Sequence, residues 1–141
     1  MTLITSCAIY SEPDLMYSLY KSGMSGYFDF HQCNSDIAFS CAISALRYFG
    51  YEIREIDEKH YRIYGKKWDK YARLYDVDDF TAAIVEVEYI PSLETSKVTL
   101  SLIEVKEGIR GRMGFYQISN YEYYKPFFDK LERLINLKTK H

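Results

Sequence analysis

The four residues Ile4-Thr5-Ser6-Cys7 are the part of the chain whose types and spacing most directly indicate a chemical modification. They match the end of a bacterial lipoprotein signal, in which an aliphatic residue, a small or β-branched residue and then Ser, Gly or Ala precede a cysteine. The pattern predicts that Cys7 is the lipid attachment point and that residues up to Ser6 are a signal remnant. Only six residues precede Cys7, and they lack the basic region and the apolar stretch of roughly 7–15 residues that a secretory signal needs. The alternative is an ordinary initiator Met followed by a buried or free cysteine.

A second candidate is the segment from residue 66 to 75, where basic and aromatic side chains are interleaved. The candidate interaction surface comprises Lys66, Lys67, Trp68, Lys70, Tyr71, Arg73 and Tyr75. Such a mixture can stack on bases, lie on anionic lipid headgroups or form a protein-binding hot spot. The formal net charge of −2 and the pI near 5.9 favour a protein or membrane surface over nucleic acid. The alternative is a connecting segment in which Trp68 plugs the edge of the core and the lysines are solvated.

The pair His31 and Cys33 combines two residue types that bind metals or act as nucleophile and base. A zinc site needs about four ligands, and His60 and His141 lie far away in the sequence. No third catalytic group or oxyanion motif accompanies the pair. We therefore predict no catalytic residue, no metal site and no cofactor, and interpret His31 and Cys33 as an incidental pair at a strand end. Cys41 lies on the apolar stripe of an expected helix, too far along it from Cys33 for a disulfide.

The triplet Asp76, Asp78 and Asp79 resembles a fragment of a calcium-binding loop but lacks the glycine and the distant glutamate of that motif. We interpret it as a solvated loop. The composition suits one compact domain, because 48% of the 141 residues are hydrophobic and 27% are charged. No apolar run approaches the roughly 20 residues that span a bilayer. Any link to a membrane must therefore be a covalent anchor or a partner.

The periodicity predicts a short N-terminal helix that starts near Ser11 and Pro13 and ends near Gly23. We expect residues 1–26 to form a tether and this helix, and residues 27–141 to form a single domain. That domain would begin with a short strand at 27–31. A helix at about 35–49 would follow, capped by Asn34 or Ser35 and ended by Gly50.

Alternating patterns predict a hairpin at 51–54 and 61–64, then a looser segment at 65–80, and an antiparallel strand pair at 83–89 and 97–102. Residues 112–118 form a candidate last strand. The C-terminal helix is expected at about 122–138, with a cap at Asn120 and either a kink at Pro126 or a start nearer Lys125. The expected class is α+β, with an antiparallel β-sheet of about 4–6 strands packed against two main helices, plus the short N-terminal helix.

A resemblance rests on the run from Ile37 to Ile53, followed by Asp57 and by Tyr61-Arg62-Ile63-Tyr64-Gly65. In this stretch a helix ends in Gly-Tyr, an outgoing strand turns at an acidic residue and a returning strand finishes near a Gly. The chain resembles small Gram-negative envelope lipoproteins of the helix–antiparallel-sheet–helix type, BamC-like in outline. The resemblance implies an accessory or binding role without catalytic residues, and it transfers no binding site.

Three hypotheses follow. The leading one is a non-enzymatic lipoprotein of the bacterial cell envelope that binds a protein partner and no nucleic acid, anchored through Cys7. Ala8 stands where such lipoproteins carry Asp for retention in the inner membrane, which favours the periplasmic face of the outer membrane. The alternative is a cytosolic specificity chaperone or an immunity-type inhibitor, with Met1 as the true start. The third is an enzyme that uses His31 and Cys33.

Overall fold

The structure is a computed structural model that describes residues 11–69, 79–108 and 112–140. These residues form an antiparallel sheet with the strand order β1-β5-β4-β3-β2, in which β6 also pairs with β5. The strands are β1 Tyr27–His31, β2 Glu52–Asp57, β3 Arg62–Trp68, β4 Phe80–Ile90, β5 Thr95–Glu107 and β6 Met113–Gln117. The helices are α2 Glu12–Lys21, α3 Ser35–Tyr48 and α5 Lys125–Thr139, with 3₁₀ turns η1 Pro91–Leu93 and η3 Tyr121–Tyr123. The expected α+β class is confirmed, including the short N-terminal helix.

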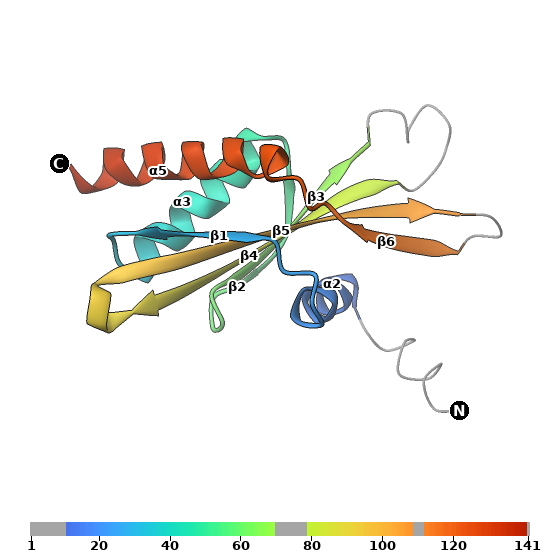
Figure 1. The fold of residues 1–141 in the computed structure, drawn as a ribbon, viewed down its shortest axis with the longest axis horizontal. Coiled ribbons are helices and arrows are strands. Elements are labelled where there is room, and N and C mark those ends of the chain that lie inside the picture. Colours follow the sequence, from blue (N-terminus) through green and yellow to red (C-terminus); the bar gives the residue numbers. More distant parts are fainter. Residues whose placement is uncertain (1–10, 70–78, 109–111, 141) are drawn as a thin grey trace.

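The sheet is covered on both faces, by α3 and α5 on one side and by α2 on the other (Figure 1). Both faces need a cover because the side chains of β4 are apolar on each side of the sheet. Ala83 and Val85 join the core beneath α3 and α5. Ala82 and Ile84 join a second core that includes Met16 of α2, which is 1% exposed. Helix α2 is thus packed onto the sheet, whereas residues 1–10, which include the expected tether, lie outside the described residues.

The expected helix ends are confirmed where a local signal marks them. The Ser11 side chain accepts a hydrogen bond from the Asp14 N–H at 3.2 Å, and the Asn34 side chain accepts one from the Ile37 N–H at 2.8 Å. Gly50 follows α3 with a φ of +88°, a conformation that glycine adopts without a steric penalty. No helix within the described ranges is long and apolar enough to cross a membrane.

One expected boundary is wrong. The looser segment predicted at 65–80 is strand as far as Trp68 and again from Phe80, because β3 pairs with β4 along the whole of β3. For the C-terminal helix the alternative start near Lys125 is confirmed, and Asn120 caps the turn η3 that precedes it. Pro126 falls in the first helical turn, where its missing N–H costs nothing, and the kink is not needed.

Two strands, β1 and β6, pair with the same outer edge of β5, and a short gap separates them. β1 pairs with β5 up to Leu100, and β6 pairs with it from Ile103 onward. The buried Tyr124 fills this interval, where its hydroxyl accepts a hydrogen bond from the Leu102 N–H at 3.1 Å and donates one to the Ile118 carbonyl.

Gly26 lies against the same place, where only a residue without a side chain fits. A Cβ on Gly26 would come within 2.2 Å of the Leu100 carbonyl oxygen and 2.6 Å of the Tyr124 ring. The Tyr27 ring adds edge-to-face contacts with Tyr121 and Tyr124, at centroid distances of 5.0 and 4.8 Å. This tyrosine cluster therefore joins β1, β6 and the start of α5.

The substitution Tyr124→Phe keeps the ring but leaves the buried Leu102 N–H and the Ile118 carbonyl without this partner. We expect the free energy of unfolding to fall by about 1–3 kcal/mol, as measured by urea denaturation followed by circular dichroism. The control is Tyr121→Phe, with an expected change below about 0.5 kcal/mol, because Tyr121 is 42% exposed. Equal losses in the two variants would contradict the bridging role of the Tyr124 hydroxyl.

Candidate functional site

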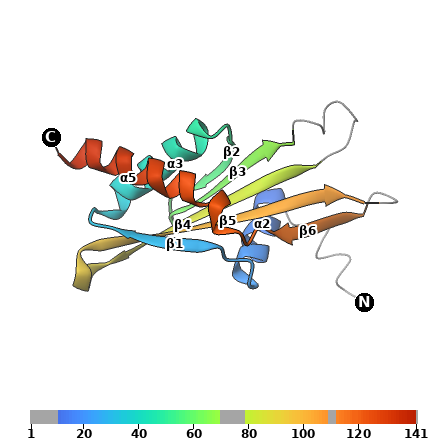
Figure 2. The same cartoon turned by 45° about the horizontal axis from the view of Figure 1, so that its top comes forward.

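A groove of about 550 Å³ lies between the end of α3, the start of α5 and the sheet. In Figure 1 and Figure 2 the strands extend well beyond the first turn of α5. We call this space the α5 groove. Its interior is mainly aromatic and aliphatic, with a lining that includes Phe49, Tyr51, Leu102, Tyr123 and Phe127. The groove can therefore take up an apolar group of the size of one or two large side chains.

Charged residues of both signs stand at the sheet end of the α5 groove. The Lys67 ammonium lies 5.6 Å from the centre of the Tyr51 ring. Lys106 forms an ion pair with Glu104 at 3.5 Å. The Asp79 carboxylate accepts a hydrogen bond from the Glu107 N–H at 2.9 Å, which fixes it near the start of β4. An apolar interior with a polar rim is the usual anatomy of a protein-binding surface.

The structure places only part of the predicted interaction surface at this groove. Lys67 lines it, whereas Trp68 reaches its lining only at the end of β3, because the Trp68 ring lies on the other side of the strand. There it packs edge-to-face on Phe80 at a centroid distance of 5.6 Å, against the core beneath α2. The alternative in which Trp68 plugs the edge of the core is confirmed for Trp68, but its solvated lysines are wrong for Lys66. Lys66 points to the other side of β3 and is 5% exposed, so it offers almost no surface to a partner. The remaining residues of the predicted surface, Lys70, Tyr71, Arg73 and Tyr75, lie outside the described residues, as does Cys7.

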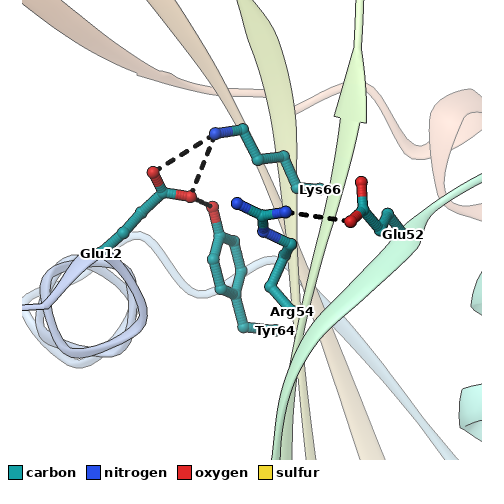
Figure 3. A network of polar contacts seen from close by, with 5 residues as sticks. All are labelled: Glu12, Glu52, Arg54, Tyr64 and Lys66. Atoms are coloured by element: carbon teal, nitrogen blue, oxygen red, sulfur yellow. Dashed lines mark hydrogen bonds and ion pairs between the residues drawn. The ribbon is translucent and has the colours of Figure 1, made fainter.

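Lys66 is instead the centre of a polar network that fastens α2 to the sheet (Figure 3). Its ammonium lies 3.2 and 3.3 Å from the two carboxylate oxygens of Glu12. The same nitrogen stands 4.1 Å from the ring centres of both Trp68 and Phe80. A carboxylate together with two ring faces supplies the negative potential that a buried lysine requires. The first residue of α2 is thus held by a strand more than fifty positions away.

Tyr64 completes this network by donating a hydrogen bond from its hydroxyl to Glu12 Oε1 at 2.5 Å. Burial, followed by the nearby Glu12 carboxylate, raises the pKa of Tyr64 well above its usual value, so the phenol remains a donor. A small polar pocket of about 330 Å³ adjoins it, lined in part by Arg54 and Glu52. Arg54 donates to Glu52 at 2.9 Å, and Figure 3 shows both side chains beside the Glu12 contact. The cations of this corner therefore face carboxylates of the chain itself.

His31 and Cys33 have properties opposite to those of an activated pair. Their side chains are buried, at 5% and 8% exposed. Burial lowers the pKa of His31 and raises the pKa of Cys33, so both are neutral near pH 7, and the reactive thiolate is disfavoured. Cys33 and Cys41 are free thiols, as expected. Within the described ranges no group of three or more potential metal ligands comes together; Asp76 and Asp78 are not among those residues.

No model of a known protein family matches the chain, and no curated protein sequence matches it. The α5 groove itself was missed at the sequence level, because its lining comes from α3, β3, β4, β5 and the turn before α5. The available signal was the aromatic run at 121–124 followed by Pro126 and Phe127. Tyr124 of that run is buried, whereas Tyr123 is 65% exposed.

The substitution Glu12→Gln removes the negative charge that faces the buried Lys66. We expect the free energy of unfolding to fall by about 1–3 kcal/mol, because a buried donor loses its charged partner. Urea denaturation measures this change. Glu52→Gln is the matched control, since its ion pair with Arg54 is largely exposed and such pairs contribute less than about 1 kcal/mol. A loss in Glu52→Gln as large as in Glu12→Gln would contradict the fastening role of Glu12.

Proposed function

We propose that this protein is a non-enzymatic lipoprotein of the bacterial cell envelope that acts by binding a protein partner in the α5 groove. The observation that carries the proposal is the groove itself, with its apolar interior and its charged rim. The residue Lys67 gives it further support, because it belongs both to the groove and to the interaction surface inferred from the sequence.

The lining of the groove favours a protein ligand with an apolar anchor. Aromatic side chains in a concave, partly desolvated site are the residues that most often dominate protein binding. Tyr123 is well placed for this role, because it is 65% exposed and stands at the start of α5. Charges of both signs at the rim would orient the partner rather than supply most of the affinity.

The proposed anchor would keep the domain close to a membrane. Four peptide units separate Cys7 from Ser11, and such a length of chain spans at most roughly 14 Å. Glu12 follows directly and is bound to Lys66 of the sheet. A lipid on Cys7 would therefore hold the folded domain near the membrane surface, on the periplasmic face of the outer membrane in this proposal.

The substitution Cys7→Ser should abolish lipid attachment. Cells expressing the protein are grown with an alkyne-labelled fatty acid, and the labelled chain is detected after affinity purification under denaturing conditions. We expect the wild-type chain and Cys33→Ser to be labelled and Cys7→Ser to be unlabelled. An unlabelled wild-type chain would contradict the envelope assignment and favour a cytosolic binding protein.

The substitution Tyr123→Ala should weaken partner binding in the α5 groove. A photoreactive amino acid at Lys67 is activated in cells of the source organism, and the covalent adduct is identified by mass spectrometry. Loss of an interface aromatic costs about 1–2 kcal/mol, so we expect at least about fivefold less of the same adduct. Tyr48→Ala is the control, because Tyr48 is also 65% exposed and lies outside the groove. If the protein with Tyr123→Ala formed as much adduct as the protein that keeps Tyr123, the groove would be contradicted as the binding site.

A further inference from the structure

The β1 strand carries a pair of exposed phenylalanines on the side of the sheet opposite the α5 groove. Phe28 and Phe30 are 54% and 46% exposed, and their rings contact each other at a centroid distance of 5.5 Å. Lys97 of β5 lies over the Phe28 ring at 4.3 Å. Helix α2 lies beside this patch without covering it, since the Tyr20 hydroxyl donates to Glu86 on β4 and is also hydrogen-bonded to Thr99 on β5, while both phenylalanines stay exposed.

The backbone of β1 is also open along its outer edge. β1 is the first strand in the sheet order, and none of the described elements pairs with its other side. Figure 2 shows this strand along the border of the sheet. In an antiparallel pair, alternate residues point their N–H and C=O groups away from the neighbouring strand. The Phe30 N–H donates to its neighbour Asp29 Oδ1 at 2.8 Å, which indicates that Phe28 and Phe30 present their backbone groups outward.

The charges around this edge select the kind of segment that fits it. Asp29 points to the α5 side of the sheet, where its carboxylate and that of Glu132 both act on the buried His31. On the opposite side, Lys97 is paired across the sheet with Glu88. A segment with a basic residue facing Asp29 would find an opposite charge there.

The same charges disfavour two other occupants. If two copies of β1 paired over their full length, Asp29 would stand directly opposite its own copy, which is destabilising. An anionic membrane that covered Phe28 and Phe30 would meet Glu88 as well as Lys97, so electrostatic attraction would be weak.

We propose that β1 is a docking edge for an extended segment of a protein partner, which adds a strand to the sheet. Apolar side chains of that segment cover Phe28 and Phe30, and a Lys or Arg lies beside Asp29. Backbone hydrogen bonds to Phe28 and Phe30 supply affinity and the alternating side chains supply specificity, as in other cases of strand addition. This site is separate from the α5 groove, so its test is independent of the tests of the proposed function.

The test uses the ¹⁵N-labelled protein and two short peptides, Ser-Thr-Val-Lys-Val-Thr-Ser and the same peptide with Glu in place of Lys. We expect the Lys peptide to shift the amide resonances of Phe28 and Phe30 on titration. Binding of the Glu peptide should be at least about fivefold weaker, because a like charge then faces Asp29. Equal affinities of the two peptides, or shifts that leave β1 unchanged, would overturn the proposal.

Two variants test the contribution of Phe30 and that of the charge. Phe30→Pro removes both an outward N–H and the exposed Phe30 ring without touching the pairing with β5, at a position where edge strands tolerate proline, and it should abolish peptide binding. Asp29→Asn keeps the acceptor for Phe30 and should make the two peptides bind equally. Tight binding to Phe30→Pro would overturn the proposal. Shifts of Phe28 and Phe30 caused by phosphatidylglycerol vesicles, with none caused by either peptide, would overturn it in favour of a membrane contact.

Discussion

The hydroxyl of Tyr124 satisfies the backbone of β5 at the interval between two strands, and most of the molecule is arranged around that point. β5 pairs with three strands, and two of them, β1 and β6, share its outer side. A buried N–H without a partner is costly, so the interval needs a donor and acceptor that no neighbouring strand supplies. Because Tyr124 directly precedes α5, the same contact sets where that helix begins, and thereby the wall of the α5 groove formed by Tyr123 and Phe127.

The two faces of the sheet carry different kinds of surface. The α5 side combines a deep core with the α5 groove, because the helices end before the strands do. The α2 side combines the Glu12–Lys66 contact with the uncovered pair Phe28 and Phe30. The described part of the chain thus carries an apolar groove on one side of the sheet and an exposed aromatic pair at the β1 edge on the other.

Local signals predicted most of the fold, and long-range contacts account for what they missed. Asn34 and Gly50 act on their own helix, so the bounds of α3 followed from nearby residues. The role of Lys66 depends on Glu12, 54 positions earlier, and nothing in the run of lysines shows that one of them is buried. The start of α5 required the contacts of Tyr124 with β5. The groove required the relative positions of two helices and three strands, which no spacing along the chain encodes.

The contacts that hold β1 against the sheet have a consequence for the order in which the chain folds. The strands from β2 to β5 follow one another as neighbours, so their pairing closes only short loops. The contacts that seal β1 are far more distant, since Ser101 and Met24 are 77 residues apart and Tyr27 and Ser119 are 92 apart. Loop closure over such separations is slow and depends on the intervening structure. The edge formed by Phe28 and Phe30 should therefore be among the last parts to assemble, so that a segment bound there would distinguish a finished domain from one that is still folding.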